Sequence, residues 1–392
     1  MKNVDHGILK DFPQRFIDEV ETPCYLISED ILKRNCELLD LVQQRTGAQI
    51  LLALKAFALP AVFPLIRKYL HGVCASGPIE AQLGVEEFGR EVHTYSPAYT
   101  EEQMKRVILF SDHILFNSIN QWQTHRNAIH AARKNISIGL RVNPGHSEVE
   151  VDLYNPCLPG SRFGIHSEDL KKVDLTGITG LHFHALCEQN ADVLVRVLES
   201  FEKQFGHYLE RMQWVNFGGG HHITRKDYDV DLLCRTISEF RKRHNGIRVF
   251  LEPGEAVVLD GGVYVTSVID IINNGMPIAI IDGSAETHLP DVLAMPYRPH
   301  IVGSGEPQEF EHIYRLGGIS CLAGDIVGDY SFPKALRISE RLILTDMALY
   351  SFVKNTTFNG VELPSIYTCS LENDSLRSIR RFGYEDYRGR IT

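Results

Sequence analysis

The stretch "EVHTYSPAYTEEQMKRVILFSDHILFN" (residues 91–117) contains one complete structural repeat. The apolar runs "EVHTYS" (91–96) and "HILFN" (113–117) have the length and composition of buried strands. Between them, "EEQMKRVILF" (101–110) places apolar residues at intervals of three and four, which is typical of an amphipathic helix. The stretch therefore predicts a strand, a helix and a second strand, the unit of an α/β fold.

The same alternation continues on both sides of this stretch. Segments with helical spacing, such as residues 191–212, separate further strand-like runs at 50–56, 72–76, 137–143, 178–185, 214–220 and 248–254. With 91–96 and 113–117 the series has eight members. Eight strand and helix repeats predict a (β/α)8 TIM barrel, placed at residues 30–258.

The pattern changes after residue 258. Runs such as "GGVYVTSVIDIIN" (261–273) alternate without long helices, which predicts a C-terminal β-rich domain over residues 259–392. The early run "TPCYLIS" (22–28) is also strand-like, so residues 1–29 are expected to add a strand to that domain. A length of 392 residues suits two domains.

Composition and charge exclude several classes of protein. A net charge of −10 argues against a nucleic-acid surface. The charged N-terminus lacks the apolar core of a signal peptide, and the most apolar stretch (51–66) is too short to span a bilayer, which predicts a cytoplasmic protein. The eight cysteines form no CxxC pair, so neither disulfides nor structural zinc are expected.

The ends of the predicted barrel strands carry many polar residues. Barrel active sites lie at the carboxyl ends of the strands, and those ends hold Lys55, Ser76, Tyr95, Asn117, Arg141, Asn143, His182, His184, Gly218, Gly219, Gly220 and Glu252. Taken alone, Lys55 in "ILLALKAF" (50–57) could extend to solvent at a strand end. Its place on this rim favours a desolvated amine that forms a Schiff base.

The residue types on the rim indicate one cofactor. The triple glycine lets backbone N–H groups cradle a phosphate. His182 and His184 could be a metal pair, but the neighbouring strand ends offer Lys55 and Arg141 rather than ligands, so no metal site is expected. A lysine, a phosphate loop, an imidazole and the carboxylate of Glu252 are the groups that pyridoxal phosphate requires.

Several motifs resemble one known family, the fold-type III, alanine-racemase-like pyridoxal phosphate decarboxylases, which include the ornithine and diaminopimelate decarboxylases. Within it they are most similar to the branch that acts on carboxynorspermidine and carboxyspermidine. The motifs span nearly the whole chain and are "ETPCYLISEDIL", "LLALKAF", "CASGPIEAQLG", "TYSPAYT", "LEPGEAVV", "GISCLAGD" and "DMALYSFVKNTTFNG".

The resemblance implies roles for individual residues. It implies that Lys55 binds the cofactor covalently, that Arg141 lies beneath the cofactor, and that His184 stacks on its ring. Glu252 would pair with the pyridine nitrogen, and the phosphate would be held by Gly218, Gly219, Gly220, Cys187 and Tyr350. It also implies a homodimer with shared active sites, in which Cys321 is the proton donor and Asp325 contacts the substrate. Carbon dioxide would be released by way of an aldimine and a quinonoid.

Two departures bear on the substrate. Glu255 stands where ornithine and diaminopimelate decarboxylases have an arginine, which favours a cationic substrate over one with a distal carboxylate. Ala285 replaces a tyrosine of ornithine-type enzymes and leaves more room. The expected reaction is decarboxylation of carboxynorspermidine to norspermidine and of carboxyspermidine to spermidine, with Glu255, Asp291, Asp325 and Asp329 as candidate partners of the distal amines.

Three alternatives remain open from the residues. The protein could decarboxylate diaminopimelate, ornithine or arginine, or it could be a racemase of the same fold. A racemase needs a second acid or base, usually a tyrosine, whereas "GISC" (318–321) offers a thiol. The third alternative is a non-catalytic carrier of pyridoxal phosphate, although such carriers are usually single-domain proteins.

Overall fold

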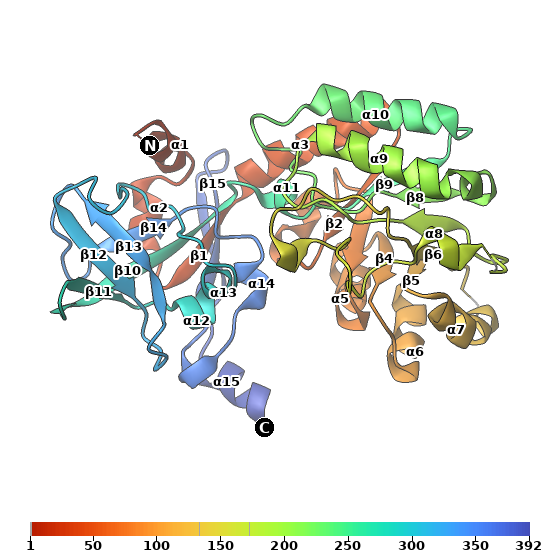
Figure 1. Ribbon diagram of the computed structural model, residues 1–392. Coiled ribbons are helices and arrows are strands. Elements are labelled where there is room, and N and C mark those ends of the chain that lie inside the picture. The colour runs from red at the N-terminus through yellow and green to blue at the C-terminus, as the bar shows by residue number, and fades with distance from the viewer. Residues whose placement is uncertain (1, 133, 172) are drawn as a thin grey trace. The chain divides into compact units, whose positions relative to one another are not determined.

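The computed structural model describes residues 2–132, 134–171 and 173–392 (Figure 1). The chain forms two compact units. One comprises Asn35–Val257, and the other joins the residues up to Arg34 to those from Val258 onward.

The first unit is a closed barrel of eight parallel strands, which confirms the predicted TIM barrel. Each strand pairs with the next along the chain, and β9 closes the barrel by pairing with β2. The strands are β2 (Gln49–Ala53), β3 (Gly72–Ala75), β4 (Glu91–Tyr95), β5 (His113–Phe116), β6 (Ser137–Arg141), β7 (Gly180–His182), β8 (Trp214–Asn216) and β9 (Arg248–Leu251).

Helices and helical turns connect these strands. They are α3 (Glu29–Thr46, which begins in the other unit), η1 (Pro60–Val62), α4 (Phe63–Ile66), α5 (Pro78–Leu83), η2 (Gly84–Phe88), α6 (Glu101–Phe110), α7 (Ile119–Ala131), η3 (Asp152–Tyr154), α8 (Ser167–Leu170), α9 (Ala191–Phe205), η4 (Gly206–Arg211), α10 (Val230–Arg243) and α11 (Glu255–Val258). Helices α9 and α10 lie side by side on the outside of the barrel (Figure 1).

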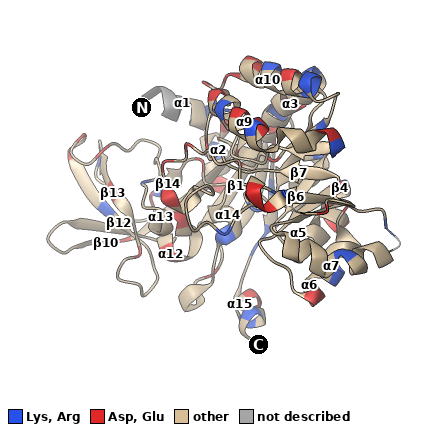
Figure 2. Ribbon diagram, turned by 45° about the vertical axis from the view of Figure 1, so that its right-hand side comes forward, with Lys and Arg blue, Asp and Glu red and all other residues tan. Residues whose placement is uncertain are grey.

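Local sequence explains where the longer helices begin and end. Thr100 caps α6 in a capping box with Gln103. Helix α10 has Asp231 in its first turn and Arg241, Lys242 and Arg243 in its last, which complements the helix dipole. Figure 2 shows acidic and basic residues interspersed on the outer helices of the barrel rather than segregated by sign.

The barrel interior is filled by large aromatic side chains opposite glycines. A Cβ on Gly139 or Gly180 would overlap the ring of Trp214, so these two positions on β6 and β7 provide its space. Trp214 packs with Leu51, Leu115 and Phe250 in a buried cluster. The strands thereby hold their register, and with it the alternation of inward-facing residues on which the site depends.

The second unit is built on a mixed sheet with the order β13-β12-β11-β10-β1-β15-β16, and β14 pairs with β10. Strand β1 runs antiparallel to β10 and parallel to β15, so a strand from the start of the chain lies inside this sheet. The strands are β1 (Cys24–Ser28), β10 (Gly262–Asn273), β11 (Pro277–Ile281), β12 (His312–Gly317), β13 (Ile326–Phe332), β14 (Arg341–Leu344), β15 (Ser365–Ser370) and β16 (Ser375–Arg380).

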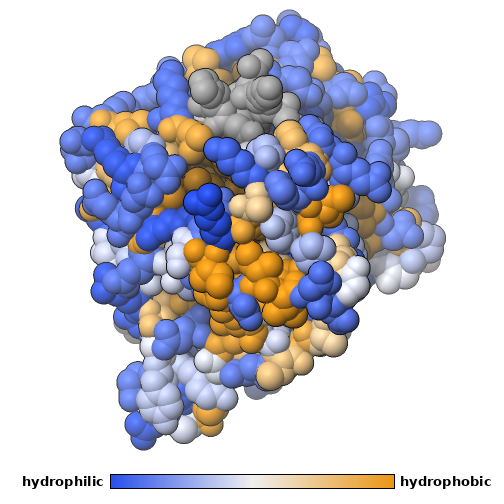
Figure 3. Space-filling model, turned by 90° about the vertical axis from the view of Figure 1, so that its left-hand side faces the viewer, coloured by the Kyte–Doolittle hydropathy of each residue, from blue (hydrophilic) through white to orange (hydrophobic). Residues whose placement is uncertain are grey.

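Short helices complete this unit: α1 (Lys2–Asp11), α2 (Gln14–Glu19), α12 (Ala285–His288), α13 (Pro290–Ala294), α14 (Ser351–Lys354), η5 (Phe358–Gly360) and α15 (Tyr384–Ile391). Apolar side chains also reach its surface (Figure 3), and Ile269 and Ile272 on β10 are among those exposed. Among the described residues, no helix combines the length and apolarity that crossing a membrane requires.

Candidate active site

The predicted rim residues of the barrel unit do lie at the carboxyl ends of its strands. Arg141 and His182 are the last residues of β6 and β7, and Glu252 directly follows β9. Lys55, His184 and the glycines 218–220 stand a little further on, in the loops after β2, β7 and β8. The barrel register brings Arg141 opposite His182, and His182 opposite Asn216.

Glu252 is held by two polar neighbours. The Asn216 amide donates to Glu252 Oε1 at 2.7 Å, and His182 Nε2 lies 3.5 Å from Oε2. Burial alone would raise the pKa of this carboxyl, but the imidazoles of His182 and His93 and the amide of Asn216 outweigh burial and lower it to about 2. Glu252 is therefore ionised at neutral pH.

The glycine turn after β8 is bound to His184. The Gly219 N–H donates to His184 Nδ1 at 2.8 Å, so this nitrogen carries no proton. Burial lowers the pKa of His184 well below its usual range, with contributions from the charges of Lys55 and Arg141. The ring is thus a neutral imidazole whose orientation is fixed by the glycine backbone.

At each of the three positions 218–220, a side chain would be sterically unfavourable. Gly218 and Gly220 have φ values of 72° and 82°, a conformation that L side chains rarely adopt. A Cβ on Gly219 would overlap the carbonyl oxygen of Glu252, and one on Gly220 would overlap that of Leu186. The turn therefore presents bare backbone at the rim, where the N–H groups of Gly218 and Gly219 already donate to Asn216 Oδ1 and His184 Nδ1.

Arg141 is buried beneath aromatic rings. Its guanidinium carbon lies 4.7 Å from the ring centroid of Tyr95 and 4.3 Å from that of Phe163, and Nη2 donates to the carbonyl oxygen of His184 at 3.3 Å. Burial lowers the pKa of this guanidinium. A cation enclosed in this way is held rigidly, and it adds positive charge beside the rim.

Lys55 differs from the expectation of a desolvated amine, because its side chain is exposed in the single chain. The residue lies in a turn beyond the end of β2, where the barrel wall no longer covers it. Its ammonium still faces the rim: its charge contributes to the lowered pKa values of His182 and His184, where burial dominates. Lys55 is therefore at the predicted end of the barrel but is more exposed than predicted.

Cys187 and Glu255 lie near Lys55 on the same rim. Burial raises the pKa of the Cys187 thiol to about 12, Glu255 raises it further, and Lys55 opposes both effects. The thiol is therefore protonated and can donate a hydrogen bond. Glu255 is half-buried at the start of α11, so an acid of the predicted substrate set does lie in the barrel unit.

Five further predicted residues belong to the β-rich unit. Cys321 is exposed, and its backbone N–H donates to Asn359 Oδ1 at 2.7 Å. Tyr350 has a φ of 36° at the start of α14, and Lys354 Nζ lies 5.2 Å from its ring centroid. Asp291 accepts a 2.5 Å hydrogen bond from Lys354 Nζ. This acid therefore already has a cationic partner.

Asp325, the fourth, is buried and fully engaged within its own unit. Its oxygens accept hydrogen bonds from Ser284 Oγ at 2.9 Å and from the backbone N–H groups of Ala285, Glu286 and Ser320 at 2.6, 3.2 and 3.0 Å. The carboxylate ties the loop that carries Cys321 to the start of α12. Asp329, another candidate acid, forms a two-pronged pair with Arg315 on the neighbouring strand.

Comparison with known proteins identifies the family. The protein-family model described as "Pyridoxal-dependent decarboxylase, C-terminal sheet domain" matches residues 24–348. The chain belongs to the pyridoxal-dependent decarboxylases.

Two curated relatives are similar to this decarboxylase over nearly full length. It is 44% identical over 383 residues to the carboxynorspermidine/carboxyspermidine decarboxylase of Campylobacter jejuni, covering 95% of this chain and 99% of the relative. It is 42% identical over 378 residues to the carboxyaminopropylagmatine decarboxylase of a Synechocystis species, covering 96% of each chain.

A solved structure agrees with both the family and the fold. The crystal structure of carboxynorspermidine decarboxylase from C. jejuni, complexed with norspermidine, superimposes with a TM-score of 0.87 at 42% identity. It covers 95% of this chain and all of the other. The resemblance proposed from the sequence motifs is thereby confirmed.

Two side chains that build the site of this decarboxylase, Asn216 and Phe163, were not predicted from the sequence, whereas Tyr95 was expected on the rim. Asn216 fixes Glu252, and Tyr95 and Phe163 enclose Arg141. Asn216 could have been found, because it alternates with Trp214 and Gly218 along one strand face. Phe163 lies in a long loop, and nothing in its local pattern indicates that it folds over Arg141.

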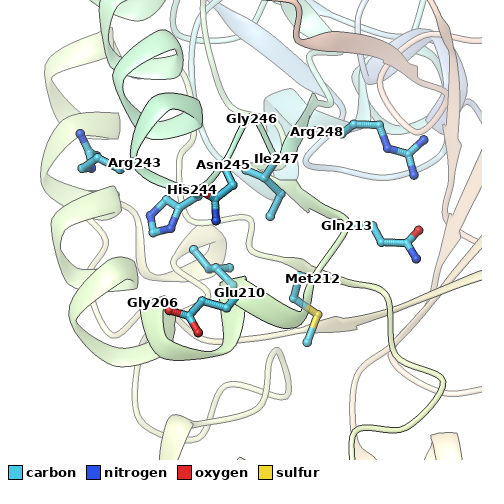
Figure 4. Close-up of a pocket in the computed structure, with 11 residues that line it drawn as sticks. Gly206, Glu210, Met212, Gln213, Arg243, His244, Asn245, Gly246, Ile247 and Arg248 are labelled. Carbon is cyan, nitrogen blue, oxygen red and sulfur yellow. The ribbon is translucent and has the colours of Figure 1, made fainter.

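A polar hollow of about 450 Å³ lies away from these residues (Figure 4). Its lining includes Gln213, which precedes β8, and Arg248, the first residue of β9. It therefore lies at the amino ends of the strands, opposite the rim that carries Glu252.

Proposed function

We propose that this decarboxylase acts on carboxylated triamines, converting carboxynorspermidine to norspermidine and carboxyspermidine to spermidine in polyamine biosynthesis. The observation that carries the proposal is the 44% identity, over almost the full length of both chains, to an enzyme named for these two substrates. The related crystal structure was solved with norspermidine, the product of the first reaction.

The residues of the rim fit pyridoxal phosphate. The bare glycine backbone at 218–220 leaves room for a phosphate, with the protonated thiol of Cys187 as a donor to it. We assign Tyr350 to the same phosphate because the family motif that contains it implies that role. Lys55 supplies the amine that bonds to the aldehyde, and the neutral ring of His184 offers a flat face for stacking. Arg141, enclosed by the rings of Tyr95 and Phe163, adds a fixed positive charge beside the rim.

Glu252 is the group that we assign to the pyridine nitrogen. When bound, the cofactor accepts the electron pair that remains after the substrate carboxylate leaves as carbon dioxide. A carboxylate that stays ionised holds a proton on the ring nitrogen, and it is most effective in a site shielded from water. Asn216 and His182 keep Glu252 charged and oriented.

We further propose that the enzyme is a homodimer and that Cys321 of the partner subunit returns a proton to the substrate Cα. The loop carrying Cys321 supports this assignment, since Ile319 and Leu322 are each 40% exposed on either side of the exposed thiol. Apolar side chains around a reactive group are typical of a surface that another chain covers.

Glu255 is the acid that we assign to a distal ammonium of the substrate. It lies on the same rim as Lys55. Asp291 is paired with Lys354, and Asp325 accepts four hydrogen bonds from its own unit. We therefore propose that Asp291 and Asp325 act indirectly, through their partners within the β-rich unit. A buried ammonium without a partner would cost several kcal/mol, so Glu255 would carry much of the specificity.

A second candidate substrate is carboxyaminopropylagmatine, because the Synechocystis relative named for it is 42% identical. This compound ends in a guanidinium group rather than an ammonium group. Both cations could pair with Glu255, so the choice depends on the shape of the distal pocket.

The test is direct conversion by the purified enzyme loaded with pyridoxal phosphate. We expect carboxynorspermidine to give equal amounts of carbon dioxide and norspermidine, and the Lys55→Ala variant to give neither. A protein that releases carbon dioxide only from carboxyaminopropylagmatine would favour the second candidate.

A further inference from the structure

The side chain of Asn117 ties together two parts of the barrel unit. Asn117 directly follows β5, on the predicted rim, and no role has so far been assigned to it. Its Oδ1 accepts hydrogen bonds from the Tyr95 hydroxyl at 2.7 Å and from the N–H of Gly164 at 2.8 Å. Its Nδ2 donates to the carbonyl oxygen of Arg162 at 2.7 Å. One amide therefore links the end of β4 to the loop between β6 and β7.

The two parts that Asn117 joins form an aromatic cage, Tyr95 and Phe163, around Arg141. Phe163 lies between the two loop residues that Asn117 binds. The guanidinium carbon of Arg141 lies 4.7 Å from the ring centroid of Tyr95 and 4.3 Å from that of Phe163. Arg141 also forms a hydrogen bond with the side chain of Tyr95, whose hydroxyl donates in turn to Asn117. A chain of hydrogen bonds thus runs from the buried cation through the phenol to the amide.

The loop segment that carries Phe163 is docked closely against the end of β6. The N–H of Ile165 donates to the carbonyl oxygen of Arg141 at 2.9 Å. Gly164 has a φ of 84°, and a Cβ on it would lie 2.7 Å from the backbone nitrogen of Asn143, so this close approach requires a glycine. Together with the two contacts to the amide, this docking fixes the backbone on both sides of Phe163.

The position of Arg141 bears on the rest of the site. Its Nη2 donates to the carbonyl oxygen of His184 at 3.3 Å, and the His184 ring accepts from the N–H of Gly219 at 2.8 Å. A buried charge is stable only where the groups around it stay in place. A loosened cage would therefore disturb the imidazole and the glycine turn as well as the guanidinium.

We propose that Asn117 is a positioning residue of the decarboxylase. It holds Tyr95 and Phe163 against Arg141, and the fixed guanidinium in turn holds the backbone of His184, whose ring is assigned to the cofactor. This inference rests on the proposed binding of pyridoxal phosphate at the rim. The alternative is a purely structural amide that stabilises the loop between β6 and β7. A structural amide predicts a lower unfolding temperature with unchanged cofactor binding.

The experiment compares cofactor binding by full-length variants. The cofactor is removed from the purified enzyme, and pyridoxal phosphate is titrated back while its visible absorption is recorded. The Asn117→Ala variant loses all three hydrogen bonds of the amide. We expect its dissociation constant for pyridoxal phosphate to rise at least about tenfold, which corresponds to the net contribution of one to two hydrogen bonds.

The pH dependence of the absorption is a readout that a structural role would not change. The charges of Arg141 and Lys55 both act on His184, so the guanidinium lies within electrostatic reach of the bound cofactor. A nearby cation disfavours protonation of a nitrogen. When the cage loosens, we expect the midpoint of the pH-dependent change in cofactor absorption to rise by about 0.5 pH unit or more.

The matched control is Asn155→Ala, in the same loop between β6 and β7. Asn155 accepts from the N–H of Cys157 at 3.0 Å and donates to the carbonyl oxygen of Val149 at 3.4 Å. This variant should unfold at a lower temperature but keep the dissociation constant and the absorption midpoint of the unmodified enzyme. If Asn117→Ala matches the control in both cofactor readouts, the proposal is overturned.

A second variant, Tyr95→Phe, keeps the test decisive if Asn117→Ala fails to fold. It retains the ring beside Arg141 and removes only the hydroxyl that joins this ring to Asn117. We expect its dissociation constant to rise about threefold, and unchanged binding would contradict the proposal. An unmodified protein that binds no pyridoxal phosphate would instead overturn the proposed function, and this inference with it.

Discussion

The side chain of Asn216 joins the acid of the site to its glycine turn. Its amide nitrogen donates to Glu252 Oε1 at 2.7 Å, and its oxygen accepts from the N–H of Gly218 at 2.8 Å. A single buried amide thus fixes the ionised carboxylate assigned to the pyridine nitrogen and the backbone assigned to the phosphate. Both ends of the cofactor would be positioned by one residue.

Replacing the Asn216 amide with a carboxylate should separate its contact with Glu252 from its contact with Gly218. In the Asn216→Asp variant the hydrogen bond from the N–H of Gly218 is kept. The amide group that donated to Glu252 is replaced by a carboxylate oxygen, which cannot donate. Loss of a hydrogen bond to a charged group is worth about 1.5–3 kcal/mol, so we expect kcat to fall roughly tenfold to a hundredfold. Steady-state kinetics measure this effect.

The control for that variant is Asn155→Asp, because Asn155 accepts from the N–H of Cys157 in the same kind of turn. It should keep nearly normal kcat. Equal kcat values for the two variants would show that the contact between Asn216 and Glu252 has no catalytic weight.

The lowered pKa of Glu252 predicts a pH-dependent contribution to stability. Its pKa is 4.5 in the unfolded chain and about 2 in the folded protein, so the stabilisation is complete above pH 4.5 and is lost as the pH falls through 2. The shift corresponds to about 3 kcal/mol at pH 7. We expect the difference in unfolding free energy between wild type and Glu252→Gln to shrink by about 1 kcal/mol from pH 6 to pH 3.5.

Tryptophan fluorescence in urea can follow this transition, because both tryptophans, Trp122 and Trp214, lie in the barrel unit. A difference that stays constant over this pH range would contradict the lowered pKa.

Asp325 should act through the loop that carries Cys321. Asp325→Asn replaces one carboxylate oxygen with an amide and leaves at least one of its four donors without an acceptor. We expect a loss of about 2–3 kcal/mol in stability and a lower kcat. Thermal unfolding and steady-state kinetics test both.

Asp329→Asn is the matched control, because Asp329 is partly exposed and paired with Arg315. It should cost less than about 1 kcal/mol and leave kcat unchanged. If the two variants behave alike, Asp325 is not the anchor of the Cys321 loop.

The proposed sharing of sites between subunits can be tested by mixing inactive variants. Lys55→Ala and Cys321→Ala should each be nearly inactive alone. After subunit exchange, half of the dimers are mixed and each contains one intact site, so about a quarter of the wild-type activity should return. A mixture that stays inactive would place both residues in one chain's site.

The barrel could be predicted because its signal is local and repeated. Each short apolar run and each helical segment obeys its own periodicity, and all eight runs contain the observed strands β2 to β9 or overlap them. The chemistry-bearing residues followed from the rule that barrel sites lie at the strand ends. The runs 178–185 and 214–220 are longer than the strands they contain, because His184 and the glycines 218–220 lie in loops.

Other features depend on contacts between residues far apart in the sequence, which no local pattern indicates. The exposure of Lys55 depends on where the barrel wall ends, and the engagement of Asp325 depends on Ser284 and Ala285, which are forty and more residues away. The pairing of β1 with β10 and β15 fixes a sheet from distant parts of the chain. The side-chain environments of these residues therefore required the structure.

The central claim is that the enzyme prefers carboxylated triamines. The measurement that tests it is carbon dioxide release from carboxynorspermidine, carboxyspermidine, carboxyaminopropylagmatine, ornithine, arginine and meso-diaminopimelate, assayed side by side with the same preparation. We predict kcat/KM for carboxynorspermidine or carboxyspermidine at least about a hundredfold above that for diaminopimelate, whose distal carboxylate Glu255 would repel. We predict a similar margin over ornithine, which is too short to place its ammonium group where a triamine places its distal one. A preference for diaminopimelate or ornithine would contradict this account of the substrate.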